Sequence, residues 1–87
     1  MMYTVFIERY AQKQLMKLSV TEIPFIKEAI ASLAVNPRPI GYKKLKGEHA
    51  WRIRVGNYRV IYEIYDEQVI VVVITIGHRK DVYRRDN

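Results

Sequence analysis

The stretch WRIRVGNYRVIY, residues 51–62, decides the fold of this chain. Apolar and charged residues alternate on either side of Gly56-Asn57, and the side chains of a strand point to opposite faces with a period of two. The stretch therefore predicts two antiparallel strands joined by a two-residue turn. One face of this hairpin carries only apolar and aromatic side chains, which are Trp51, Ile53, Val55, Tyr58, Val60 and Tyr62.

The opposite face of the same hairpin carries three arginines. Arg52, Arg54 and Arg59 point to this side, and Arg54 is expected directly across from Arg59. Like charges in that position destabilise a pair of strands. An exposed ion pair, such as one between Arg52 and Glu63, contributes only about 0–1 kcal/mol and would not relieve the repulsion. The alternative is a preformed cluster that binds phosphate, because the planar guanidinium fork matches phosphate oxygens.

Two helices are expected between a first strand and the hairpin. Residues 3–7, YTVFI, are rich in β-branched and aromatic side chains and predict the strand. Ala11 and Leu15 then follow each other at helical spacing. A second helix is expected after Thr21, which can cap it, and residues 36–39, NPRP, end it because proline cannot continue a helix.

The last predicted strand covers residues 69–76, VIVVVITI, and is apolar at nearly every position. Such a strand is typical of the interior of a sheet. The order of one strand, two helices and three strands predicts a single α+β domain over residues 1–87. In this domain we expect the helical hairpin to pack on one face of a small, mainly antiparallel four-stranded sheet, with the arginine face partly open.

Composition narrows the class of partner. The 87 residues carry a net charge of +6 and give a pI of about 9.7, which favours a polyanion such as nucleic acid. There is no cysteine, so a disulfide framework and a thiolate metal site are excluded. The N-terminus lacks a basic leader with a long apolar stretch, and the longest apolar run is about half of a membrane span. We expect a cytoplasmic protein with no membrane partner.

A lysine-rich loop precedes the hairpin and contains Lys43, Lys44 and Lys46. Such a loop is either simply solvated or, beside the arginine face, extends a positive track along a nucleic-acid backbone. Both interpretations remain open at this stage, and the three lysines are candidate RNA-binding residues.

The segment GHRKDVY, residues 77–83, follows the last strand. If that strand begins after a turn at Asp66-Glu67, its alternation brings His78 to the arginine face, whereas a slip of one residue would reverse this. Arg79 and Tyr83 lie close by in sequence, and Tyr83 offers a ring on which a base can stack. The chain has no Gly-rich phosphate loop, nucleophile elbow or metal-ligand spacing, so we predict neither a metal nor a cofactor.

Taken together, the strand, the helical hairpin, the LKG loop, WRIRVGNYRVIYEI, the apolar strand and GHRKDVY resemble the RelE/ParE superfamily of bacterial and archaeal toxins from type II toxin–antitoxin modules, RelE-like members in particular. The resemblance covers nearly the full chain. It implies that Arg52 and Arg54 match two basic residues before the family's turn, which are lysines in the best-known RelE toxin. It also matches three further family residues to Arg59, Arg79 and Tyr83.

RelE-type toxins cut messenger RNA in the ribosomal A site, using the ribose 2′-hydroxyl as nucleophile to leave a 2′,3′-cyclic phosphate and a 5′-hydroxyl. The resemblance thus implies an mRNA endoribonuclease that acts on the 70S ribosome. It also implies a RelB-like antitoxin that neutralises the toxin and carries the complex to operator DNA. The arginines would clamp the scissile phosphate. Because arginine keeps a pKa above about 12, His78, with an ordinary pKa near about 6.5, is the candidate for proton transfer.

Two other functions remain open. ParE-type members of the superfamily inhibit DNA gyrase without cutting nucleic acid, and they can carry a similar hairpin. An inactive member could instead act mainly with its antitoxin as a DNA-binding regulator. The conjunction of the hairpin with GHR and the late Tyr83 favours the nuclease.

Overall fold

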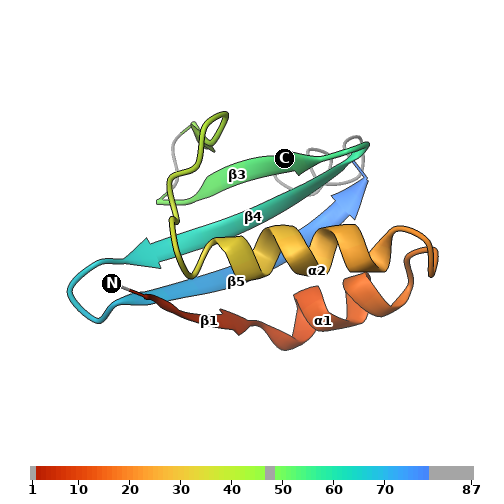
Figure 1. Ribbon diagram of the computed structural model, residues 1–87, viewed down its shortest axis with the longest axis horizontal. Helices are drawn as coiled ribbons and strands as arrows, with labels where there is room; N and C mark the ends of the chain where they lie inside the picture. The colour runs from red at the N-terminus through yellow and green to blue at the C-terminus, as the bar shows by residue number, and fades with distance from the viewer. Residues whose placement is uncertain (1, 47–48, 79–87) are drawn as a thin grey trace.

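The computed structural model describes residues 2–46 and 49–78, which form one mixed sheet with two helices on one of its faces (Figure 1). The strands lie in the order β1-β5-β4-β3-β2, with β1 parallel to β5 and all other neighbours antiparallel. The predicted α+β class is confirmed. In chain order the elements are β1 (Thr4–Ile7), α1 (Arg9–Met16), α2 (Ile23–Ser32), β2 (Lys43–Lys44), β3 (Trp51–Val55), β4 (Tyr58–Tyr65) and β5 (Ile70–His78).

The sheet has five strands rather than the predicted four, because part of the lysine-rich loop forms a short edge strand. Strand β2 pairs with the start of β3, and Lys43 lies opposite Arg52. A hydrogen bond of 2.8 Å from the Leu45 N–H to the Ala50 carbonyl continues this pairing. The backbone of this part of the loop is therefore fixed to the hairpin, while the side chains of Lys43 and Lys44 are exposed.

The helices follow the predicted apolar spacing, and α1 buries Ala11 and Leu15. Helix α2 begins at Ile23, and Thr21 does not cap it, although the sequence favoured that role. The Thr21 hydroxyl instead lies 2.8 Å from the Ser19 hydroxyl, within hydrogen-bonding distance. No helix in the described ranges is long and apolar enough to cross a membrane.

The β3–β4 hairpin has the register that its sequence predicts, with Val55 opposite Tyr58 and Arg54 opposite Arg59. Gly56 adopts a φ of +60°, which glycine allows at the first central residue of a tight hairpin turn. The apolar face of the hairpin packs against the helices. The core cluster includes Ile26, Ile30 and Leu33 from the helical region and Ile53, Val60 and Tyr62 from the hairpin.

Strand β5 contains a β-bulge that is not apparent from the sequence. Tyr62 pairs with Val73, but the next residue along, Ile61, pairs with Thr75. Ile74 is therefore an extra residue on β5, and the alternation of side chains changes parity at this point. The first half of β5 follows the predicted faces and the second half does not.

The bulge corrects the predicted position of His78. This residue pairs with Tyr58, whose side chain packs against the helix-facing core, and the two rings meet edge to face with centroids 5.8 Å apart. The prediction that His78 lies on the arginine face is therefore wrong, because one inserted residue in β5 moves it to the other side of the sheet.

Tyr62 ties the centre of the sheet to the loop after α2. Its side chain is fully buried, and its hydroxyl donates a hydrogen bond of 2.7 Å to the Pro37 carbonyl. Burial raises the pKa of this hydroxyl to about 12, so it remains a donor throughout the neutral pH range.

Arg38 fixes the same loop to the turn between β4 and β5. Its Nη1 and Nη2 donate to the two carboxylate oxygens of Asp66 over 3.1 and 2.7 Å. The Tyr3 hydroxyl donates to the same carboxylate over 2.7 Å. The hydrogen bonds from Arg38, followed by that from Tyr3, lower the pKa of Asp66 from 3.8 to about 2.

Tyr62→Phe is expected to lower the free energy of unfolding by about 1–2 kcal/mol, because it leaves the buried Pro37 carbonyl without its hydrogen bond. Urea denaturation followed by circular dichroism measures this loss. Tyr65→Phe is the matched control: Tyr65 is exposed, its hydroxyl donates to Glu63, and we expect a loss below about 0.5 kcal/mol. Equal losses in the two variants would contradict this role of Tyr62.

Asp66→Asn is expected to lower thermal stability at neutral pH but to have less effect in acid. The folded-state pKa of Asp66 lies below its unfolded value of 3.8, so its stabilising contribution is complete above that pH and is lost as the pH falls toward 2. Melting temperatures of the two proteins should therefore converge over this range. A difference that stays constant from neutral pH to pH 2 would argue against the ion pair.

Candidate functional site

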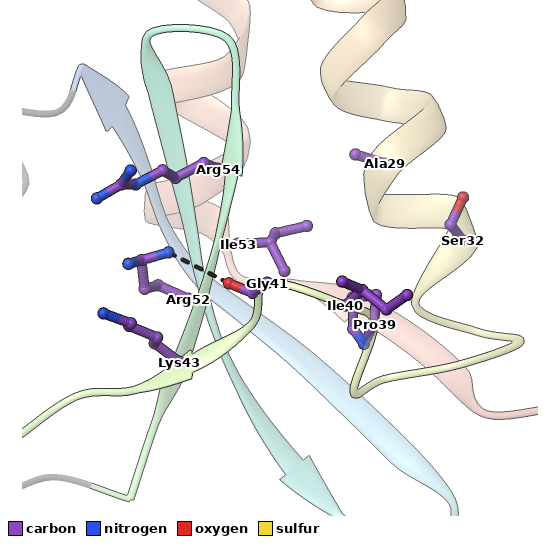
Figure 2. Close-up of a pocket in the computed structure, with 9 residues that line it drawn as sticks. All are labelled: Ala29, Ser32, Pro39, Ile40, Gly41, Lys43, Arg52, Ile53 and Arg54. Carbon is purple, nitrogen blue, oxygen red and sulfur yellow. Dashed lines mark hydrogen bonds between the residues drawn. The ribbon is translucent and has the colours of Figure 1, made fainter.

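The arginine face, defined by Arg52, Arg54 and Arg59, lies on the side of the sheet away from the helices. Strand pairing sets Lys43 beside Arg52 and Arg54 beside Arg59, so a cation row crosses β2, β3 and β4. Figure 2 shows Lys43, Arg52 and Arg54 pointing to one side of the sheet, whereas Ile53 points to the other. The row of Lys43, Arg52, Arg54 and Arg59 is called the cation row below.

Exposure differs sharply along the cation row. Arg54 is exposed, but Arg52 and Arg59 are only 5% and 3% exposed. The guanidinium of Arg52 makes a long hydrogen bond of 3.5 Å to the Gly41 carbonyl, which holds it against the loop before β2. The arginine face is thus less open than the sequence suggested, and Arg54 is its accessible member.

For Arg52 and Arg54, the described part of the chain contains no salt bridge of the kind that the alternative interpretation requires. Glu63, the carboxylate on the same face, accepts a hydrogen bond of 2.6 Å from the Tyr65 hydroxyl. Within residues 2–46 and 49–78, the one ion pair found is Arg38–Asp66, at the opposite end of β4. The charges of Lys43, Arg52 and Arg54 therefore meet no carboxylate there.

The structure separates the three candidate lysines. Lys43 joins the cation row, whereas Lys44 pairs with Trp51, whose side chain packs on the helix-facing core. Alternation along β2 therefore directs Lys44 to the other face of the sheet. Lys46 is exposed beyond the end of β2. Only Lys43 has the position that a continuous positive track requires.

None of the three C-terminal candidate residues lies in the cation row within the described part of the chain. His78 lies beside Tyr58 on the helix-facing side of the sheet. Arg79 and Tyr83 lie outside the described residues. Their predicted roles in phosphate clamping and base stacking remain predictions.

A groove next to the cation row was not predicted from the sequence. It forms a hollow of about 530 Å³ between α2 and β3, where Ala29 and Ser32 of α2 face Ile53. Pro39, Ile40 and Gly41 close one end, and Lys43, Arg52 and Arg54 lie along the other side (Figure 2). The spacing of proline and glycine in Pro39-Ile40-Gly41 is a turn signal, but it does not reveal what the turn lies against.

The chemistry available at this face is electrostatic. Guanidinium groups donate hydrogen bonds to phosphate oxygens and stabilise negative charge, but with a pKa above about 12 they do not accept protons. Among the described residues, no group of three or more His, Asp, Glu or Cys side chains could hold a metal ion. The arrangement is suited to binding a phosphodiester and stabilising charge that develops on it.

Comparisons with known proteins identify the family of this chain. The model of the family described as "ParE toxin of type II toxin-antitoxin system, parDE" matches residues 5–83. The toxin RelG of Mycobacterium tuberculosis is 38% identical over 88 residues, covering 98% of this chain and 100% of RelG. The mRNA interferase toxin RelE of Escherichia coli is 31% identical over 83 residues, covering 92% of this chain and 86% of RelE.

A solved structure of a toxin in complex with its antitoxin has a similar fold. A chain of the toxin–antitoxin complex RelBE2 from Mycobacterium tuberculosis matches with a TM-score of 0.80 and 32% identity, covering 91% of this chain and 100% of that one. The family match extends from β1 past the end of β5 and thus includes both helices and the cation row. This chain therefore belongs to the RelE/ParE superfamily of type II toxins and is a RelE-like member of it.

Proposed function

We propose that this toxin is a ribosome-dependent mRNA endoribonuclease. The observation that carries the proposal is the cation row, in which Lys43, Arg52 and Arg54 meet no carboxylate among the described residues. The relative from Escherichia coli is named an mRNA interferase. A phosphate placed against the row would neutralise charges that otherwise repel one another, which favours binding of an RNA backbone.

In the proposed reaction the 2′-hydroxyl attacks the adjacent phosphate and the 5′ oxygen leaves, giving a 2′,3′-cyclic phosphate and a 5′-hydroxyl. Negative charge accumulates on the phosphate oxygens in the transition state. Donors that are already in place lower this barrier, because they need not reorganise during the reaction. The buried Arg52 and Arg59 provide fixed positive charge, and the exposed Arg54 reaches the substrate. Arg79 and Tyr83 complete the clamp and the stacking surface in this proposal.

Proton transfer is not assigned to the cation row. A guanidinium group offers hydrogen-bond donors but no acceptor. His78 lies across the sheet beside Tyr58, so we no longer favour it as the group that exchanges a proton with the RNA. The row is proposed to accelerate cleavage by charge stabilisation and by positioning the phosphate for in-line attack.

A RelB-like antitoxin is the proposed partner. The similar structure from Mycobacterium tuberculosis is a complex of toxin and antitoxin. We propose that the cognate antitoxin of this chain neutralises it by direct binding and carries the complex to operator DNA.

Inhibition of DNA gyrase is the second candidate function, and the match to the ParE family model favours it. The two functions are separated by one pair of assays on the purified toxin. Mapping of 5′ ends on ribosome-bound mRNA should reveal cuts within the A-site codon, and gyrase should supercoil plasmid DNA normally in the presence of the toxin. Loss of supercoiling without mRNA cuts would show that the toxin inhibits gyrase and is not a nuclease.

Arg54→Ala is expected to lower the rate of mRNA cleavage on ribosomes by about 10- to 100-fold, the effect of losing about 1.5–3 kcal/mol of charge-assisted hydrogen bonding to phosphate. Arg9→Ala is the matched control, because Arg9 is an exposed cation on α1 and its loss changes the net charge equally. We expect its rate to stay within about twofold of wild type. Similar losses in both variants would show that net charge, not the cation row, governs activity.

His78→Gln is expected to cleave mRNA at a rate close to that of wild type, with an unchanged dependence on pH. The bulge at Ile74 places His78 on the side of Tyr58 rather than beside Arg54. Single-turnover cleavage measured between about pH 6 and 8 covers the range in which an ordinary histidine titrates. Loss of a pH-dependent step in the variant would restore His78 as a proton-transfer group.

A further inference from the structure

A side chain of α1 holds the main chain of β5 just after the bulge. Strand β1 ends at Ile7, opposite Val73, and within the described residues no strand pairs with this edge of β5 beyond that point. Gln14, which is half-buried on α1, takes the place of the missing strand. Its Oε1 accepts a hydrogen bond of 2.7 Å from the N–H of Ile76. The helical layer is thereby connected to the end of the sheet that borders the cation row.

The hydrogen bond to Gln14 requires the bulge. The main-chain groups along a strand point alternately to its two sides. The Val73 carbonyl accepts from the Glu8 N–H over 2.9 Å, so the main chain of Val73 points toward β1. Without the extra residue at Ile74, strict alternation would direct the N–H of Ile76 toward β4, away from α1. Gln14 therefore stabilises the bulged register over a regular one.

The bulge decides which residue lies beside Arg59. In the observed pairing Gly77 lies opposite Arg59, and Ile76 is fully buried in the core. If the pairing of Tyr62 with Val73 continued without a bulge, Ile76 would lie opposite Arg59 instead. The bulge thus exchanges an isoleucine for a glycine on the arginine face.

The burial of Arg59 requires space of this kind. The residue is only 3% exposed, and its Nε has no contact with solvent. Its neighbour on β3 is Arg54, whose like charge repels it, and its neighbour on β5 is Gly77, which has no side chain. The Cβ atoms of paired residues lie only about 4.5–5.5 Å apart, so a branched side chain opposite Arg59 would compete with it for the same space.

The backbone of Gly77 does not itself require a glycine. The residue lies within β5 and is not among the described residues with a positive φ. Glycine weakens the interior of a strand, and its presence there often marks the close approach of another group. Burial of Ile76 explains why β5 is bulged, but it does not explain why the position opposite Arg59 carries no side chain.

We propose that Gly77 and Gln14 are positioning residues for Arg59: Gly77 leaves the space in which the guanidinium is held, and Gln14 maintains the bulge that brings Gly77 there. This inference rests on the proposed function, because Arg59 is taken to stabilise the charge that develops on the RNA phosphate. β-Bulges are frequent next to active sites, where they change the direction of a side chain. A cation already held in place stabilises a transition state without reorganisation.

Gly77→Ala and Gly77→Val test the space beside Arg59. Alanine and valine suit a strand better than glycine does, so both variants should melt at or above the temperature of wild type. The maximal single-turnover rate on ribosome-bound mRNA should nevertheless fall, about threefold for Gly77→Ala and about 30-fold for Gly77→Val, because the guanidinium is displaced. The toxin concentration that gives the half-maximal rate should stay within about twofold, because docking on the ribosome does not depend on this space.

Val72→Ile is the matched control for the glycine variants. It adds one carbon on the same strand and the same face, but opposite Glu63 rather than Arg59. Its maximal rate should stay within about twofold of wild type. Unchanged cleavage in Gly77→Val would overturn the inference. A lower melting temperature in Gly77→Ala, with a proportional loss of activity, would also overturn it and assign the glycine to packing.

Gln14→Met removes the acceptor but nearly keeps the length of the side chain. Amide hydrogen exchange at Ile76, followed by NMR, should become about tenfold faster, and the maximal cleavage rate should fall about tenfold. Gln14→Glu retains an acceptor oxygen and should restore the rate to within about threefold of wild type. Tyr62→Phe also loses a buried hydrogen bond, but far from Arg59, and should cleave normally. Equal rate losses in Gln14→Met and Tyr62→Phe, or no rescue by Gln14→Glu, would assign Gln14 to stability alone and overturn the inference.

A double-mutant cycle tests whether Gly77 acts through Arg59. Arg59→Ala should lower the maximal rate by itself. Adding Gly77→Val to Arg59→Ala should change the rate by less than about twofold, because the space is no longer needed. Losses that multiply would show that Gly77 acts independently of Arg59 and would overturn the inference.

A measurement without mRNA separates this inference from the function on which it rests. The Nε–H of Arg59 is buried, so it should exchange slowly and give a resolved NMR signal in wild type and in Val72→Ile. The signal should be lost in Gly77→Val and in Gln14→Met. This pattern without any mRNA cleavage by wild type would reject the nuclease and keep the positioning of Arg59. Cleavage by wild type, with an unchanged signal in Gly77→Val, would keep the nuclease and overturn the inference.

Discussion

The period of two along β3 and β4 is the constraint on which the rest of the structure depends. Every second residue must face the helices, where Ile53, Val60 and Tyr62 are buried. A charge at such a position would lie in the apolar core against the helices, so the charged residues of the hairpin occupy the positions between. Antiparallel pairing then sets Arg54 beside Arg59. The rule that builds the core therefore also assembles the cations, and the apolar face supplies the free energy that holds like charges together.

The same constraint explains what could be predicted from the sequence. The hairpin carries its charges in strict alternation, so its register and its two faces follow from the pattern alone. The strand at residues 70–78 is apolar on both sides, and nothing in its sequence reveals that Ile74 is an extra residue. The bulge depends on how β5 meets β4, and it reversed the face of His78. The alternation of residue types reveals which face a side chain lies on only where one face of the strand is apolar and the other is polar.

The groove and the burial of the arginines were not predictable for a different reason. Both depend on contacts between segments that are distant in sequence, such as Gly41 with Arg52 and Ala29 with Ile53. The sequence indicated a loop around Gly41, but it did not reveal the turn there, in which Gly41 has a φ of +93°. Local patterns also assigned Arg52 to a partly open face, whereas it is 5% exposed beneath the preceding loop. The residue types of the site were therefore readable from the sequence, but their accessibility was not.

The differing exposure of the arginines gives each a different part in recognition. A buried guanidinium such as Arg59 acts through its field, which is less screened by salt than that of an exposed charge. The exposed Arg54 can meet an anion directly, and any anion that does so relieves its repulsion with Arg59, whether it is a phosphate or a carboxylate. Charge alone thus cannot separate a substrate from an inhibitor at this face.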